Sequence, residues 1–138
     1  MNIDKLSAQL SIDEDKRAKP YKDTVGKLTI GIGRNLDDVG LSPDEIQYLL
    51  GNDIARVKAE LDGAMPWWSQ MTDARQNVLA NMCFNMGLPR LSGFVNTLAA
   101  MQTGKYGAAA DGMLASKWAA QVGDRAKRLA ATMRTGAF

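Results

Sequence analysis

Three oxygen-bearing side chains follow one another near the start of the chain, within the stretch Ile12–Gly33. Eight residues separate Glu14 from Asp23, and five separate Asp23 from Thr29. Hydrolysis of a glycosidic bond needs one group that protonates the leaving oxygen, one that takes a proton from water and one that helps to hold that water. Two carboxyls and a hydroxyl on one short folded-back segment can supply these functions, so the stretch predicts a site for glycosidic hydrolysis.

The composition excludes several other chemistries. The chain has no histidine and a single cysteine, Cys83. The lack of histidine excludes Ser-His-Asp and Cys-His catalysis and every metal site that contains histidine. One cysteine cannot form an internal disulfide or a thiolate cluster, and on an apolar helix it is expected to be buried and inert. Acid–base chemistry therefore falls to carboxylates, lysine or tyrosine, and we expect no metal ion and no cofactor.

The segment before Glu14 predicts how this residue is held. Asn2–Asp13 has apolar residues at helical spacing, which places Glu14 at the end of a short helix. Taken alone, Glu14 has a second interpretation as a solvated surface glutamate. The later Asp23 and Thr29 favour the catalytic interpretation.

The segment after Glu14 predicts a β-hairpin. Pro20 disfavours helix at the preceding residue and begins an extended stretch, and Gly26 allows a tight turn. Residues 27–33 then alternate apolar and polar side chains with a period of two, and Thr29 lies on the polar face. Gly33 leaves that face bare, so that a bulky ligand can lie against the backbone.

A long helix follows the hairpin and divides the chain into two lobes. Ser42-Pro43-Asp44-Glu45 is a strong helix start, in which Ser42 is the N-cap and Glu45 completes a capping box. Glu45 therefore has a structural role, and Glu60 lies on the polar face of the same helix. The helix is expected to reach about Leu61 and to stop at Asp62-Gly63. The lobes are then residues 1–62 and 63–138.

The second lobe is predicted to be wholly helical. Thr72 caps the most apolar helix, which Gly87 closes and which we place at the centre of the lobe. Trp67 and Trp68 could stack on sugars, but packing beneath the connector is favoured. Shorter helices are expected at about Gly93–Thr103, Tyr106–Ser116 and Asp124–Arg134. The fold class is mainly α (α+β), with a β-hairpin lobe joined by a long helix to an all-helical lobe.

The charge distribution and the first residues bear on partners and location. The formal net charge is +2, and basic residues gather toward the C-terminal end. A modest basic end is compatible with an anionic polymer partner. The first residues lack an apolar run long enough for a signal peptide or a membrane anchor. We therefore expect a product that is kept in the cytoplasm, with no stable insertion into a membrane.

A series of motifs resembles a known family over nearly the whole chain. IDE, YKDT and TIGIG, followed by NMCFNMG, SGFVNTL, SKW and DRAKR…MRTG, are similar in order and spacing to the lysozymes of T-even phages and related phage endolysins. The resemblance implies a single lysozyme domain over residues 1–138 with a lysozyme-like two-lobe fold. It implies a muramidase that cuts the β-1,4 bond between N-acetylmuramic acid and N-acetylglucosamine in peptidoglycan, with inversion at the anomeric carbon.

The resemblance also implies roles for individual residues. Glu14 matches the catalytic acid, Asp23 the carboxylate that activates or stabilises, and Thr29 the hydroxyl that holds the water. Arg125 matches a residue that pairs with the catalytic glutamate. Phe84, Asn85 and Thr97 match positions that line the saccharide cleft. By the same resemblance we expect an enzyme that acts on peptidoglycan and needs a separate pore-forming holin to pass from the host cytoplasm to the periplasm and cell wall. We also expect a monomer that binds no nucleic acid.

The chain departs from the family pattern at three places. Arg34 stands where the family often has a histidine paired with an acidic residue of the spacer helix, and Asp53 matches that acidic residue. We therefore expect an ion pair between Arg34 and Asp53. The loop Asn35–Leu41 is much shorter than in the T-even phage proteins, and Gly112 stands where they have a cleft asparagine.

Two other functions compete with hydrolysis. A lytic transglycosylase uses one acidic residue and no activated water, so the presence of Asp23 and Thr29 argues against it. A non-catalytic module could bind the cell wall, or could bind nucleic acid through the basic helix Asp124–Arg134. That helix has few basic residues and no interleaved aromatic residues, and its Leu129 and Met133 are expected to be core contacts.

Overall fold

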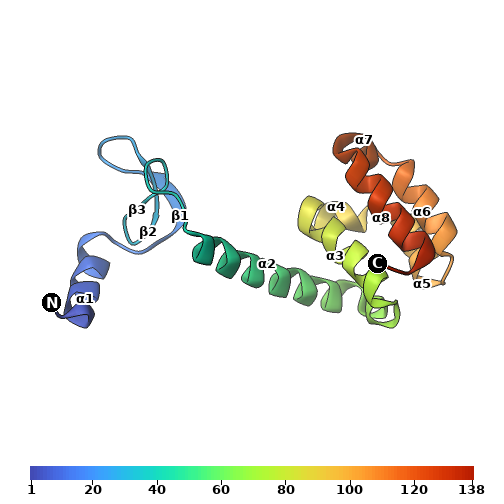
Figure 1. Cartoon of the computed structure of the whole chain (residues 1–138), viewed down its shortest axis with the longest axis horizontal. Coiled ribbons are helices and arrows are strands. Elements are labelled where there is room, and N and C mark those ends of the chain that lie inside the picture. Colours follow the sequence, from blue (N-terminus) through green and yellow to red (C-terminus); the bar gives the residue numbers. More distant parts are fainter. The chain divides into compact units, whose positions relative to one another are not determined.

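The computed structural model describes all 138 residues, Met1–Phe138, and is mainly helical with one small antiparallel sheet (Figure 1). The predicted fold class is confirmed. The chain forms two compact units, unit 1 (Met1–Leu49) and unit 2 (Leu50–Phe138). The boundary between them lies inside the long helix α2 (Pro43–Ala64), whereas the sequence places the division of the lobes near residue 62.

The elements are α1 (Ile3–Asp13), β1 (Arg17–Lys22), β2 (Leu28–Gly31), β3 (Arg34–Asn35), α2 (Pro43–Ala64), η1 (Pro66–Gln70), α3 (Asp73–Met86), α4 (Leu88–Ser92), α5 (Val95–Gln102), α6 (Tyr106–Leu114), α7 (Lys117–Val122) and α8 (Asp124–Thr135).

Helix α1 confirms the predicted first helix and the position of Glu14. The side chain of Asn2 caps its start by accepting a hydrogen bond from the Lys5 N–H at 2.9 Å. Glu14 is the C-cap, and its own N–H donates to the Leu10 carbonyl. The next residue, Asp15, has a φ of +61°, which is the left-handed conformation that commonly ends a helix. The chain therefore turns away directly after Glu14, toward the sheet.

The sheet has three strands in the order β1-β2-β3, and the sequence predicts only the first two. The third strand, β3, is only two residues long and lies at the start of what was expected to be a loop. The prediction that Pro20 begins the extended stretch is also wrong, because β1 starts at Arg17. The register between β1 and β2 shifts between Arg17 and Tyr21, so Pro20 lies in a bulge of an edge strand, where its missing N–H is tolerated.

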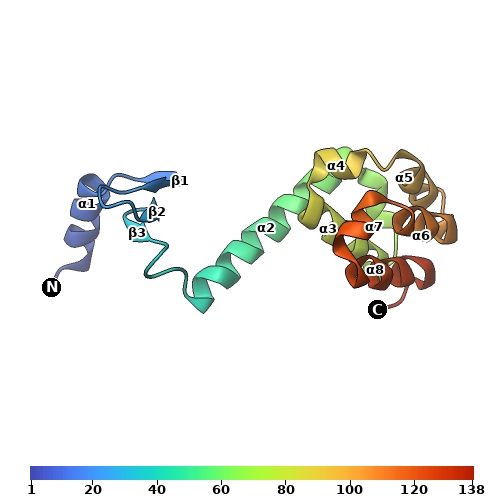
Figure 2. The same ribbon diagram turned by 90° about the horizontal axis from the view of Figure 1, so that it is seen from above.

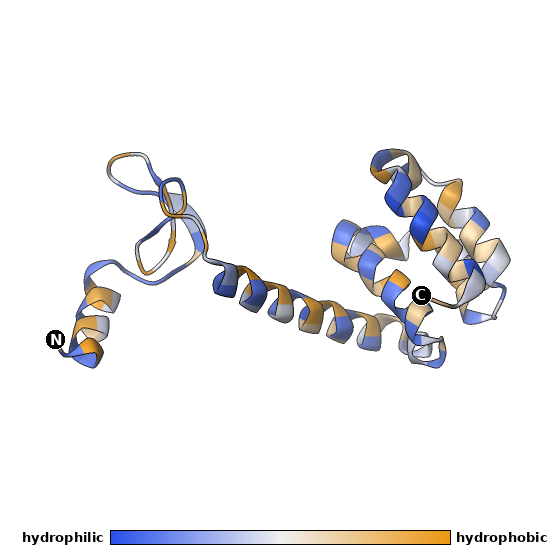
Figure 3. Ribbon diagram, viewed as in Figure 1, coloured by the Kyte–Doolittle hydropathy of each residue, from blue (hydrophilic) through white to orange (hydrophobic).

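Helix α2 begins at the predicted capping box and ends later than predicted. Ser42 N–H donates to Oε1 of Glu45 at 2.9 Å, and Glu45 N–H donates to Oγ of Ser42 at 3.3 Å. Asp62 and Gly63 do not stop the helix, which continues to Ala64. Asp62 instead holds the last turn, because it pairs with Lys58 and accepts a hydrogen bond from the indole of Trp68. Hydrophobic and hydrophilic residues alternate along α2 (Figure 3).

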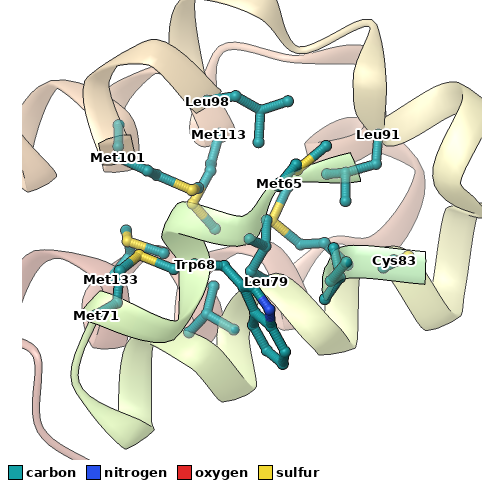
Figure 4. Close-up of a cluster of buried hydrophobic side chains, with 14 of the residues drawn as sticks. Met65, Trp68, Met71, Leu79, Cys83, Leu91, Leu98, Met101, Met113 and Met133 are labelled. Atoms are coloured by element: carbon teal, nitrogen blue, oxygen red, sulfur yellow. The ribbon is translucent and has the colours of Figure 1, made fainter. Parts of the chain in front are cut away.

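Unit 2 has one hydrophobic core, and α3 contributes more buried residues to it than any other helix, as predicted. Helix α8 packs beside α6 and α3, and α5 packs beside α6 (Figure 2). Figure 4 shows methionine side chains meeting with leucines and with Trp68 in this core. Trp68 is 7% exposed and Trp67 is partly buried, which confirms packing as their role.

The helices after α3 correspond to the predicted ones, with two additions. Short helices α4 and α7 occupy segments for which the sequence predicts no helix. Each is at most six residues long, which is too short for an apolar period to be recognised. Met133 is fully buried and Leu129 is partly buried on α8, so both are core contacts as expected. None of the helices combines the length and the hydropathy that are needed to cross a membrane.

The predicted ion pair between Arg34 and Asp53 is wrong. The guanidinium of Arg34 contacts Oε1 of Glu45 at 2.6 Å, and Asp53 pairs with Arg56 one helical turn further along α2. Glu45 already accepts a hydrogen bond from the Ser42 N–H, so one carboxylate both caps α2 and ties β3 to the start of that helix. The hydrogen bond from Arg34, followed by those from Ser42, lowers the pKa of Glu45 to about 2.

Glu45 gives unit 1 a pH-dependent stability. Because its pKa is lower in the folded chain than the ordinary value of 4.5, the ionised carboxylate stabilises the fold above about pH 4.5, and this contribution disappears as the pH falls toward 2. We expect Glu45→Gln to lower the melting temperature at pH 7 and to make little difference below about pH 2. Thermal melts followed by circular dichroism across this range provide the measurement. Arg34→Gln should remove most of the same pH dependence, and an equal effect of Glu45→Gln at every pH would contradict the assignment.

Candidate active site

Asp23 and Thr29 are held together by the backbone of one residue, Lys27. The N–H groups of Val25 and Lys27 donate to Oδ1 of Asp23 at 3.0 and 2.8 Å. The carbonyl oxygen of Lys27 accepts from the Asp23 N–H and from the hydroxyl of Thr29, both at 2.9 Å. The turn between β1 and β2 therefore fixes one carboxylate oxygen of Asp23 and the orientation of the Thr29 hydroxyl. Oδ2 of Asp23 takes no part in the turn.

Thr29 lies deeper than its place in the sequence pattern suggests. The alternation in β2 does put it on the face opposite Leu28 and Ile30, and Thr29 is only 4% exposed. Strand β2 is the central strand, and Tyr21 and Asn35 stand directly beside Thr29 on its two neighbours. Because the hydroxyl proton is used in the bond to Lys27, the oxygen is left to accept a hydrogen bond from water.

Glu14 lies against the turn between β2 and β3. Its carboxyl end crosses Gly33, and a Cβ atom built on Gly33 would stand 2.9 Å from Oε2, 3.0 Å from Cδ and 3.1 Å from Cγ of Glu14. The rest of the side chain projects from the exposed end of α1. Unit 1 thus supplies an exposed carboxyl, a carboxylate with one oxygen fixed by amides, and an oriented hydroxyl. This is the set of groups that hydrolysis of a glycosidic bond requires.

Unit 2 brings Phe84 and Arg125 together. Nε and Nη2 of Arg125 both donate to Oδ1 of Asn81, at 3.0 and 2.7 Å. Phe84, one turn further along α3, shares a groove of about 420 Å³ with this pair. The groove is mostly apolar and is lined by Leu50, Ile54, Val57, Asn77, Ala80, Asn81, Phe84 and Arg125. The predicted pairing of Arg125 with Glu14 stays a prediction.

Asn85 and Thr97 lie outside that groove. Oδ1 of Asn85 accepts a hydrogen bond from the indole N–H of Trp118 at 2.8 Å, which leaves its NH₂ group for a ligand. Thr97 is 7% exposed, and its side chain fills the space that a Cβ atom at Gly112 would need. Glycine at position 112 is therefore explained by the close approach of α5 and α6. The roles of Phe84, Asn85 and Thr97 in binding saccharide stay predictions.

Sequence reasoning missed Asn81, the residue that orients Arg125. A signal for it was present, because Asn77, Asn81 and Asn85 recur every four residues along α3 and so form a polar stripe beside its apolar residues. The backbone of Lys27 was missed as well, and no pattern of side chains could have indicated it.

The remaining nucleophilic and metal-binding groups do not form a second site. Cys83 is buried, and burial together with the nearby carboxylate of Glu60 raises the pKa of its thiol to about 11. The predicted burial of Cys83 is confirmed, and a raised thiol pKa is the direction expected for an inert cysteine. Glu60 is less solvated than expected, because it accepts a long hydrogen bond from this thiol. No group of three or more carboxylate or thiol side chains could hold a metal ion.

Comparison with known proteins finds one matching protein family and several related proteins. A family model described as phage lysozyme matches residues 12–134. A probable T4-type lysozyme 2 of Dictyostelium discoideum is 26% identical, over 97% of this chain and 96% of its own length. The pre-baseplate central spike protein Gp5 of Enterobacteria phage T4 is 27% identical, over 95% of this chain but only 28% of its own length. The matched range includes the positions of Glu14, Asp23 and Thr29.

Proposed function

Because the match over most of its length makes this chain a member of the phage lysozyme family, and hence a glycoside hydrolase that acts on peptidoglycan, we propose which bond it cuts and how. The bond is the β-1,4 linkage between N-acetylmuramic acid and N-acetylglucosamine. The chemistry is hydrolysis with inversion at the anomeric carbon. The observation that carries this proposal is the double anchoring of Asp23 and Thr29 by Lys27, which prepares two oxygen atoms to hold one water molecule.

In the proposed reaction each of the three residues has one task. Glu14 donates its proton to the oxygen that bridges the two sugars, and the bond from that oxygen to C1 of the muramic acid breaks. A water molecule, held by the Thr29 hydroxyl, forms the new bond to C1 from the opposite face. Oδ2 of Asp23 takes the proton that this water releases. Inversion requires the carboxyl groups of Glu14 and Asp23 to stand about 6.5–9.5 Å apart, because the water must fit between Asp23 and the sugar.

The products of digestion test this reaction against its main alternative. Purified peptidoglycan digested by the protein should yield fragments with free N-acetylmuramic acid at the reducing end, which mass spectrometry detects after borohydride reduction. A lytic transglycosylase would instead yield 1,6-anhydro ends, and an N-acetylglucosaminidase would leave N-acetylglucosamine at the reducing end. Either of these results would overturn the proposed bond or mechanism.

We propose that the biological role is lysis of a host cell by a phage, with a separate holin giving access to the cell wall. The purified protein should clear a suspension of Gram-negative cells whose outer membrane has been stripped. A nucleic-acid-binding role receives little support, because three of the four basic residues of α8 have partners within unit 2. Arg125 binds Asn81, Lys127 is 3.6 Å from Asp124, and Arg134 binds Asp111. Retention on DNA without clearing of cells would favour that role instead.

A further inference from the structure

The side chain of Glu14 occupies the space beside Gly33 in which any other residue would carry its Cβ atom. Three consecutive atoms of the Glu14 side chain, Cγ, Cδ and Oε2, lie 2.9–3.1 Å from the place where Gly33 would carry a Cβ atom. Ordinary van der Waals contact with a Cβ atom begins at 3.4 Å. The three distances are nearly equal, so the carboxyl end of Glu14 lies lengthwise across Gly33. Only a hydrogen atom fits beneath it.

From this contact we propose that Gly33 is a positioning residue for the catalytic acid. The bare Cα of Gly33 is the surface on which the carboxyl of Glu14 rests, and this surface fixes the distance of the carboxyl from the backbone. The proposal rests on the proposed function of Glu14 as the acid. It differs from the role expected from the sequence, in which Gly33 leaves room for a bulky ligand to lie against the backbone.

The location of Gly33 makes it a firm support. It lies in the short connection between β2 and β3, two residues beyond the end of β2, and it has a φ of +70°. The pairing of Ile30 with Arg34 closes this connection, and Arg34 is in turn held by Glu45. Glu14, in contrast, extends from an exposed helix end. When a larger side chain at position 33 forces the two residues apart, the flexible carboxyl end of Glu14 moves, and the backbone at position 33 keeps its place.

A test has to distinguish the effect of the backbone conformation of Gly33 from the effect of the space that Gly33 leaves for Glu14. Any L-residue with a φ near +70° is strained, so Gly33→Ala has two effects at once. Gly40 provides a matched control within unit 1. Its φ is +68°, and a Cβ atom there would meet nothing closer than the Leu36 carbonyl oxygen at 3.9 Å. Gly40→Ala therefore introduces the same backbone strain without touching Glu14.

The kinetic test compares both variants on soluble peptidoglycan fragments. A methyl group at Gly33 must push the carboxyl of Glu14 outward by several tenths of an ångström or more. Since a misplacement of about 1 Å can cost about 10²-fold in rate, we expect Gly33→Ala to lower kcat by about 10²-fold. KM should change by less than about threefold, and Gly40→Ala should stay within about threefold of the unchanged protein in both constants. An equal loss in the two variants, or a rise in KM alone for Gly33→Ala, would overturn the proposal.

A second measurement tests the contact without any activity. Glu14, Glu45 and Glu60 are the three glutamates of the chain, so selective isotope labelling of glutamate gives few and separable NMR signals. We expect a nuclear Overhauser effect between the Gly33 α-protons and the γ-protons of Glu14, present in Gly40→Ala. Its absence from the unchanged protein would overturn the proposal even if Gly33→Ala failed to fold.

Glu14→Gln, assayed alongside, separates the two claims. If this variant keeps full activity, the proposed function fails whatever Gly33 does. If it is inactive while Gly33→Ala keeps the kcat of Gly40→Ala, the acid role stands and the positioning role fails.

Discussion

Glu14→Gln is expected to abolish peptidoglycan hydrolysis while the fold stays intact. The amide has the shape of the carboxyl but has no proton to deliver to the leaving oxygen, and general acid catalysis contributes roughly 10²–10⁴-fold to the rate. Glu14 is exposed at the C-cap of α1 and holds that helix through its backbone N–H, so the substitution removes no structural contact of the backbone. The rate of release of reducing ends from purified peptidoglycan provides the measurement.

Glu60→Gln is the matched control for this variant. It makes the same chemical change at a glutamate of α2 whose contacts are Cys83 and Arg56. We expect it to keep activity within about twofold, because Glu60 has no proposed role in the reaction and its surface pair with Arg56 contributes little. Activity of Glu14→Gln within about tenfold of the unchanged protein, where general acid catalysis should supply far more, would rule Glu14 out as the acid.

Thr29→Val is expected to lose most of the activity without loss of the fold. Valine fills nearly the same volume but cannot accept a hydrogen bond from the attacking water. The Lys27 carbonyl oxygen keeps its bond from the Asp23 N–H, so no buried polar group is left without a partner. Removal of one positioned hydrogen bond to the reacting water should cost about 10²-fold in kcat. Initial rates on soluble fragments, together with a thermal melt, measure both parts of the prediction.

Thr29→Ser is the control, since serine retains the hydroxyl and its bond to Lys27, and we expect it to be the more active variant by far. The stereochemistry gives an independent check on the role of the water. NMR of the first product should show the α-anomer, because water attacks the face opposite the leaving group. A β-anomer as the first product, or full activity of Thr29→Val, would defeat this assignment even if Glu14 were essential.

Most of the local structure follows from the sequence alone. The asparagine and serine caps, the apolar periods of α1, α2 and α3, and the turn at Gly26 are signals that act within a few residues. Such signals suffice to place an element approximately. The order of Glu14, Asp23 and Thr29 and the absence of histidine likewise restrict the chemistry before any contact is known. The same local signals failed for α4, α7 and β3, which are too short to show a period.

Tertiary structure decided the contacts that these residues make. Helix α2 carries several acidic residues, and the choice of Glu45 as the partner of Arg34 depends on where β3 runs, since β3 carries no recognisable pattern. The burial of Thr29 depends on its being in the middle of three strands. The fixing of Asp23 and Thr29 by Lys27 uses backbone groups, which are the same in every sequence. The support of Glu14 by Gly33 arises because a helix end and a hairpin turn, nineteen positions apart, meet where there is no side chain. The sequence thus determines which groups can react, and the folded backbone determines how they are held.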